Sequence, residues 1–151
     1  MPIKMDGPFR NTWYRGKDFY HDDKWYHGDL IDHSVFGPEN YIALPYAYSL
    51  DNIIFLRVHP ETVGPCSGRK DKRGILIYHG DILMSRYDDQ YPEDYCLEVI
   101  VYDGHKWLSY QNGVGEPDEL DEKPVLGVSE IVGNIWDNPE LLTNGGKIHA
   151  D

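Results

Sequence analysis

Residues 95–110 read YCLEVIVYDGHKWLSY, and this stretch decides the fold class. Its first eight residues alternate with a period of two, which is typical of a β-strand and places Leu97, Val99 and Val101 on one face. Asp103-Gly104 follows. This dipeptide favours a two-residue type I′ turn, because glycine adopts positive φ freely and aspartate tolerates it. The last six residues form a returning strand, so the stretch predicts an antiparallel β-hairpin.

The remainder of the chain also predicts short strands. Fifteen glycines and 10 prolines interrupt it too often for long helices. Runs of β-forming residues predict further strands at 24–31, 52–58, 74–78, 80–84 and 125–136. The runs 74–78 and 80–84 are either a strand pair or one strand kinked at Gly80, where a bulge or a close backbone approach is expected.

These strands predict an all-β, mainly antiparallel fold. A Gly-Asp-Ile-Leu element after a basic turn suits an SH3-like barrel, here with extra strands or insertions. Asn138 and Pro139 predict the N-cap and first residue of one short C-terminal helical turn, whose Leu141 and Leu142 dock on the barrel. We expect a single domain over 1–146, with room for an inserted or flanking sub-domain, and a frayed tail at 147–151.

Composition excludes several classes of protein. The chain has 151 residues, a net charge of −12 and 13% aromatic residues, which argues against a disordered chain. No apolar run approaches the roughly 18 residues that a membrane-spanning helix needs. The first residues lack the apolar segment of a signal peptide, so we expect a cytoplasmic protein. Cys66 and Cys96 lack the spacing of a zinc site and are expected to be reduced thiols.

Four segments together resemble one protein family. They are Arg15-Gly16-Lys17, Trp25-Tyr-His-Gly-Asp-Leu30, the long segment 59–82 and Ile131-Val-Gly-Asn-Ile-Trp-Asp-Asn-Pro-Glu-Leu-Leu142. Their order and spacing resemble the YopX family of phage and prophage proteins. His59, Pro65-Cys66 and Arg69 depart from the family pattern, and 32–51 and 84–95 have no strong counterpart. The resemblance implies an SH3-type barrel, a phage or prophage origin and a bacterial host, and it supplies no catalytic residues.

Candidate chemical sites are weak. The evenly spaced His21, His27 and His33 could suggest a metal, but six residues of strand span about 20 Å, so one ion could not contact two of them. The carboxylates between 88 and 94 lack the glycine of a calcium loop and suit a solvated loop. No GxGxxG, P-loop, HExxH or GxSxG motif occurs. We therefore predict no cofactor, no metal, no catalytic residue and no enzymatic activity.

The basic segment 67–74 is the less ordinary feature. We predict an exposed hairpin loop in which Gly68 and Gly74 adopt positive φ and Asp71 fixes a turn through its own side chain. Its cations are candidate interaction residues, as are two members of the aromatic-rich N-terminal part: Arg69, Lys70, Lys72, Arg73, Trp25 and Tyr26. The simpler interpretation is a solubilising tip that protects edge strands or contacts acidic loops of the same or a neighbouring subunit.

Three functions stay open. The first is a non-enzymatic phage accessory protein that contacts a host or phage protein, or a second copy of itself. The second is nucleic-acid binding through the basic loop, which the charge of −12 opposes, or its converse, an acidic DNA mimic that occupies a host DNA-binding protein. The third is an enzyme of unrecognised type. We favour the first.

Overall fold

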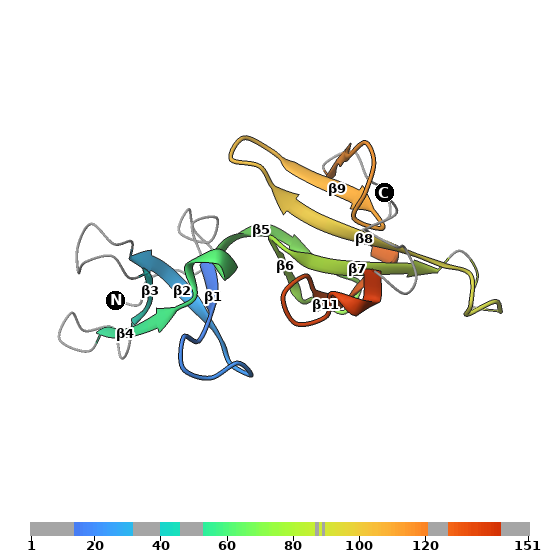
Figure 1. Ribbon diagram of the computed structural model, residues 1–151. Coiled ribbons are helices and arrows are strands. Elements are labelled where there is room, and N and C mark those ends of the chain that lie inside the picture. The colour runs from blue at the N-terminus through green and yellow to red at the C-terminus, as the bar shows by residue number, and fades with distance from the viewer. Residues whose placement is uncertain are drawn as a thin grey trace. The chain divides into compact units, whose positions relative to one another are not determined.

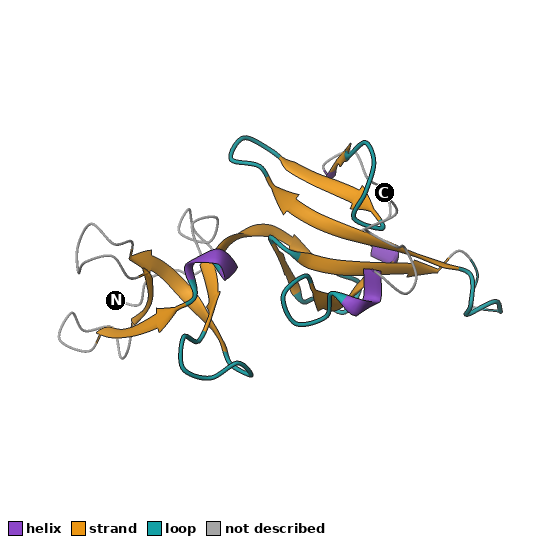
Figure 2. Ribbon diagram, viewed as in Figure 1, coloured by secondary structure: helices purple, strands orange, loops and turns teal. Residues whose placement is uncertain are grey.

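The computed structural model describes residues 14–31, 40–45, 53–86, 88, 90–120 and 127–142. These residues form an all-β protein with antiparallel sheets, which confirms the predicted fold class (Figure 2). The chain divides into two compact units, Met1–Cys66 and Ser67–Asp151. The predicted tail 147–151 lies outside the described residues.

The first unit is a meander of short strands (Figure 1). Its strands are β1 (Tyr14–Lys17), β2 (Trp25–Ile31), β3 (Asn40–Pro45) and β4 (Ile53–Val58). They are hydrogen-bonded in the order β4-β3-β2-β1-β5, where β5 (Gly64–Lys70) begins in this unit and pairs with β1 through Gly64 and Pro65. A 3₁₀ helix, η3 (Pro60–Thr62), links β4 to β5.

The last strand of this meander, β4, lies beside the end of its first strand, β1. Asp18, directly after β1, forms an antiparallel bridge with Val58 at the end of β4. The backbone N–H of Phe19 donates to the Arg57 carbonyl at 3.0 Å. Gly16 permits this approach, because a Cβ at its position would lie 2.8 Å from the Val58 side chain. This closure suits a small barrel, whereas an SH3-like arrangement of strands stays a prediction.

The second unit is built on a five-stranded sheet. In chain order its strands are β7 (Asp81–Arg86), β8 (Tyr95–Tyr102), β9 (Trp107–Gln111), β10 (Asp118–Glu119) and β11 (Ser129–Asn134). Their spatial order is β10-β9-β8-β7-β11. The end of β5 and the three-residue β6 (Leu76–Tyr78) flank the basic loop that precedes this sheet.

Strand β8 is buried on both faces. Leu97 and Val99 belong to one core cluster with Ile82 and Leu142, and Val101 packs against it. The opposite face contributes Ile100 to a second cluster. The predicted alternation along 95–102 is therefore confirmed, and each face of the sheet meets its own hydrophobic core.

The turn after β8 differs from the prediction. Tyr102 pairs with Trp107, so the hairpin loop has four residues, and the type I′ assignment is wrong. The Asp103 carboxylate accepts hydrogen bonds from the backbone N–H groups of His105 and Lys106 at 2.8 and 2.9 Å. Only Gly104 of this loop adopts positive φ, at 99°. The aspartate side chain thus stabilises a wider loop than the dipeptide rule allows.

Gly80 separates two sheets. Strand β6 belongs with β5 and β7 with β8, so 74–84 is neither a strand pair nor one kinked strand. Gly80 has a φ of 93°, and a Cβ there would lie 2.3 Å from the Trp136 ring. Its N–H donates to Ile100 and its carbonyl accepts from Ile135. The predicted close backbone approach is confirmed.

The predicted C-terminal turn is present, and it docks on the five-stranded sheet. The N–H groups of Leu141 and Leu142 donate to the carbonyls of Asn138 and Pro139, and Leu142 is buried in the core cluster of β7 and β8. The Asn138 Oδ1 accepts from the Asn134 N–H at 3.2 Å, which ties the turn to the end of β11.

Candidate functional site

The basic loop between β5 and β6 is organised by Asp71. Its Oδ1 accepts hydrogen bonds from the backbone N–H groups of Arg73 and Ile75, both at 2.9 Å. Gly68 and Gly74 adopt positive φ, at 78° and 83°. The structure thus confirms the predicted turn chemistry: an aspartate that folds the chain around its own carboxylate, with glycines where the backbone becomes left-handed.

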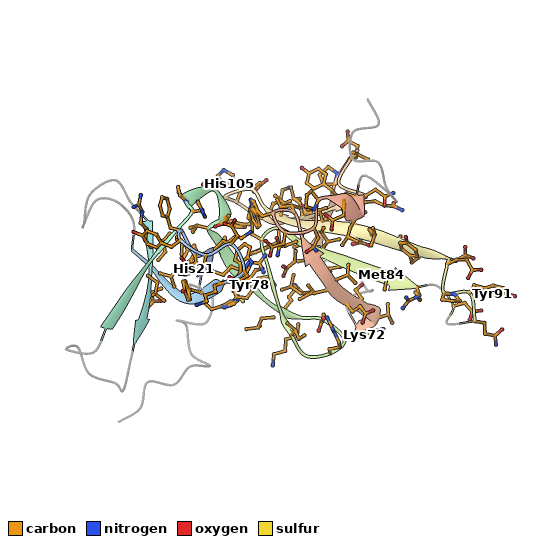
Figure 3. All side chains as sticks on the ribbon, turned by 60° about the horizontal axis from the view of Figure 1, so that its bottom comes forward. His21, Lys72, Tyr78, Met84, Tyr91 and His105 are labelled. Atoms are coloured by element: carbon orange, nitrogen blue, oxygen red, sulfur yellow. The ribbon has the colours of Figure 1, made fainter. Side chains whose placement is uncertain are left out.

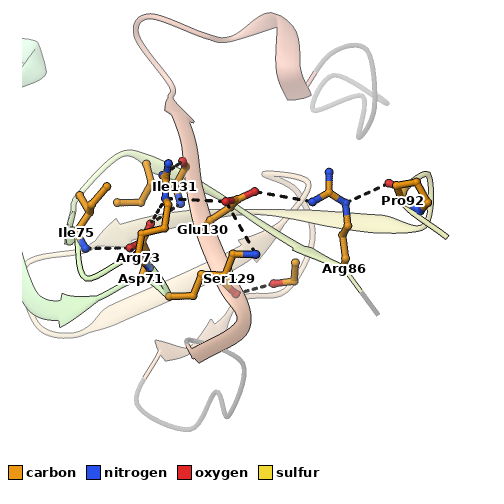
Figure 4. Close-up of polar contacts among 10 residues, drawn as sticks. Asp71, Arg73, Ile75, Arg86, Pro92, Ser129, Glu130 and Ile131 are labelled. Atoms are coloured by element: carbon orange, nitrogen blue, oxygen red, sulfur yellow. Dashed lines mark hydrogen bonds and ion pairs between the residues drawn. The ribbon is translucent and has the colours of Figure 1, made fainter. Parts of the chain in front are cut away.

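The same loop covers the outer edge of β11 (Figure 4). The Lys72 N–H donates to the Ser129 carbonyl at 2.9 Å, and the Ile131 N–H donates to Asp71 Oδ2 at 3.0 Å. Arg73 Nη2 donates to the Ile131 carbonyl at 2.6 Å. A sheet edge exposes backbone groups that can pair with other chains, and here the basic loop forms hydrogen bonds with these groups. The loop therefore protects an edge by direct hydrogen bonding.

Three cations surround one carboxylate on this part of the sheet. Glu130 lies 4.0 Å from Lys72 Nζ, 3.9 Å from Arg73 Nε and 3.9 Å from Arg86 Nη1. The Glu130 side chain is 22% exposed. Partly exposed ion pairs of this length contribute about 0–1 kcal/mol each. The pairing of these cations with Glu130 is therefore weak, and they can donate hydrogen bonds to an incoming anion.

The strand register places apolar groups beside these charges. Glu130 is opposite Met84, and Arg86 is opposite Tyr95. Because directly opposed residues and alternate residues share a face, all four lie on one face of the sheet. Met84 is half-buried and Tyr95 is 44% exposed. We call Lys72, Arg73, Met84, Arg86, Tyr95 and Glu130 the cationic surface.

Asp71 is the buried anion beneath this surface, with a relative exposure of 5%. Burial raises the pKa of its carboxyl, but three backbone N–H donors and the Arg73 guanidinium outweigh burial and hold that pKa below its ordinary value. Asp71 is therefore ionised at neutral pH. Its charge partly neutralises Arg73, whose Nε lies 3.4 Å from Oδ2.

The structure separates the other predicted interaction residues. Of the six, only Lys72 and Arg73 lie on the cationic surface. Arg69 is half-buried and Lys70 exposed on β5. Trp25 and Tyr26 belong to β2 of the first unit.

Trp25 and Tyr26 already have partners within that unit. The Arg15 guanidinium lies over the Trp25 ring at 4.8 Å. The Tyr26 hydroxyl donates a short hydrogen bond to Asp18. This bond, with burial and the negative charge nearby, raises the pKa of Tyr26. Both side chains thus contribute to the packing of the first unit.

Arg86 and Glu130 were not selected from the sequence. Both lie in strands of ordinary pattern. Their neighbours Ser85 and Ser129, whose hydroxyls meet at 2.6 Å, are 44 positions apart in the sequence. Only the pairing of β7 with β11 brings them together. The sequence did predict strands at 80–84 and 125–136. It gave no signal for how these strands pair or which residues lie opposite each other.

The histidines do not form a shared site in the described residues. His21 Nδ1 lies 3.5 Å from Asp18 Oδ2. The pKa of His27 is lowered by burial and by the nearby Arg15 charge. In the described part of the chain, no group of three His, Cys, Asp or Glu side chains could hold a metal ion. His33 and Asp89 lie outside that part.

The comparisons with known proteins decide the family. The family described as YopX protein matches residues 13–143. The chain belongs to the YopX family. This assignment confirms the resemblance carried by the motifs at 15–17, 25–30, 59–82 and 131–142.

One solved structure supports the same fold for this YopX-family chain. It is the crystal structure of protein EF1440 from Enterococcus faecalis, with a TM-score of 0.50 and 20% identity. The match covers 85% of this chain and 96% of that one. At this identity the likeness concerns the fold alone. No curated protein matches the sequence, and no helix in the described residues is long and apolar enough to cross a membrane.

The YopX motifs build turns in this structure. In the central motif, the Thr62 hydroxyl donates to the His59 carbonyl at 2.6 Å and accepts from the Lys17 N–H at 2.9 Å. In the closing motif, Asn134 Oδ1 accepts from the N–H groups of Trp136 and Asp137. The polar side chains of these motifs therefore hold backbone in place.

Proposed function

We propose that this YopX-family protein is a non-enzymatic phage or prophage accessory protein that acts in the cytoplasm of a bacterial host by binding another protein. The cationic surface carries the proposal. It combines loosely paired cations with the half-buried Met84 and the exposed Tyr95. Aromatic residues, methionine and arginine are enriched in the cores of protein interfaces.

The neighbourhood of this surface adds further apolar area. Ile75 in the basic loop and Val128, directly before β11, are both exposed. The loop binds the start of β11, because the Lys72 N–H donates to the Ser129 carbonyl. Exposed aliphatic groups next to cations suit an acidic protein partner that also supplies apolar contacts.

The motif residues support a role without catalysis. Asp71 and Thr62 both accept hydrogen bonds from backbone N–H groups. A buried carboxylate that accepts three such bonds has its pKa lowered and is a poor proton donor near pH 7. The hydrogen bonds of Asp71 and Thr62 therefore stabilise the fold.

Site-specific photo-crosslinking tests the proposal. A photoreactive residue replaces Lys72 in the full chain, expressed in its bacterial host during phage growth. A control variant of the same chain carries the photoreactive residue in place of Lys24, an exposed cation of the first unit. We expect discrete protein adducts from position 72 and not from position 24. Equal adducts at both positions, or none at position 72, would contradict the proposal.

Nucleic-acid binding is the second candidate, and the exposed Lys70 and Lys72 favour it. Glu130 opposes it, because a carboxylate among the cations repels phosphate, as does the net charge of −12. Replacing Lys70 and Lys72 with serine leaves the Arg73 bonds to β11 in place. Binding to single- or double-stranded DNA that weakens steeply with salt and disappears in this variant would favour this candidate over a protein partner.

A further inference from the structure

The hairpin that joins β7 to β8 continues beyond the cationic surface and is acidic. Asp88, Glu93 and Asp94 are exposed in it, as is Tyr91, at 52%. Figure 3 shows Tyr91 at the far end of this hairpin. Tyr95, at the base of the returning strand, is part of the cationic surface.

The described part of this hairpin has ordered turns. The Tyr91 N–H donates to the Asp88 carbonyl at 3.0 Å, and the Asp94 N–H donates to the Tyr91 carbonyl at 2.9 Å. Arg86 Nε donates to the Pro92 carbonyl at 3.3 Å, so one arginine contacts both the hairpin and Glu130. An acidic, tyrosine-bearing hairpin thus extends from the edge of a cationic, apolar surface in the same unit.

We infer that the occupant of the cationic surface is the acidic hairpin of a second copy of this chain. This inference rests on the proposed function and names its partner. A twofold axis near Arg86 would place each hairpin against the cations of the other copy. Twofold contacts of this kind are self-complementary, and each would form twice.

Charge explains why this surface would mediate the contact. Two copies of a chain with a net charge of −12 repel each other. Self-association therefore needs a place where cations of one copy meet acids of the other. Lys72 and Arg86 would face Glu93 and Asp94, while Tyr91 and Tyr95 supply rigid aromatic area.

Sedimentation velocity of the full chain tests the inference. We expect dimers at about 50 mM salt that dissociate at about 0.5 M, because salt screens exposed charges. A cation variant carries Lys72→Glu and Arg86→Glu, and a hairpin variant carries Glu93→Lys and Asp94→Lys. Each alone should dimerise at least about 100-fold more weakly, since like charges would then oppose each other across the contact. An equimolar mixture of the two variants should form heterodimers.

Control variants reverse exposed charges elsewhere. Lys24→Glu, and separately Asp22→Lys with Asp23→Lys, alter exposed residues of the first unit and should leave the dimer intact. A wild-type monomer at low salt, unchanged dimers in both variants, or a mixture that stays monomeric would overturn the inference. If the wild type is monomeric but position 72 still crosslinks to another protein, the proposed function stands without the second copy.

Discussion

Asp71 Oδ2 accepts a hydrogen bond from the Ile131 N–H at 3.0 Å, although 60 positions separate the two residues. The same carboxylate orders the basic loop through Arg73 and Ile75. One side chain therefore fixes a local turn and attaches it to the edge of the five-stranded sheet (Figure 4). The cationic surface depends on this attachment, because it holds Lys72 and Arg73 beside Glu130.

Replacing Asp71 with alanine should destabilise the protein by about 2 to 4 kcal/mol, because three backbone donors lose a buried acceptor. Urea denaturation measures the free energy of unfolding. Asp103→Ala is the matched control, since Asp103 also accepts two backbone N–H groups, but in an exposed hairpin loop. Its loss should be smaller. Equal losses for both variants would show that the bond to Ile131 contributes nothing.

Stability should fall at acid pH because of Asp71 and Asp18. For both, burial raises the carboxyl pKa, yet hydrogen bonds outweigh it and the net pKa is lowered. A lowered pKa in the folded state stabilises the protein above the ordinary value of about 3.9. That contribution disappears as pH falls through the folded-state pKa. Thermal midpoints between about pH 7 and pH 2 should fall more steeply for wild type than for Asp71→Asn. Parallel curves would refute this assignment.

Gly80→Ala should cost at least about 3 kcal/mol, the sum of the positive-φ penalty and overpacking. Its new Cβ would lie 2.3 Å from the Trp136 ring. Gly104→Ala is the control, because Gly104 has a φ of 99° and no neighbour within 4 Å of the new Cβ. It should cost only about 1–2 kcal/mol. Tryptophan fluorescence should shift for Gly80→Ala alone; the same spectrum in both variants would contradict the contact.

Leu142→Ala should destabilise the protein by about 2–4 kcal/mol, because it leaves a cavity against Ile82, Leu97 and Val99. Leu141→Ala removes the same atoms from a half-buried neighbour and should cost less. Chemical denaturation of both variants checks the difference. If Leu141→Ala cost as much as Leu142→Ala, the orientation of the C-terminal turn would be wrong.

The sequence by itself determined the local parts of the structure. Alternation along 95–102 identified β8 and its faces, because a strand turns successive side chains to opposite sides. Asp71 with Gly68 and Gly74 predicted the basic loop, because its hydrogen bonds and positive φ values concern residues within a few positions. The same local rule failed at Asp103-Gly104, where a side-chain bond favoured a wider loop.

Tertiary structure alone decided which elements meet. No local pattern states that β6 and β7 belong to different sheets, that β11 pairs with β7, or that Arg86 reaches Glu130. The physical reason is that such contacts join segments tens of residues apart. Their formation depends on closing long loops and burying both faces of the sheet together, so no short stretch of sequence contains them.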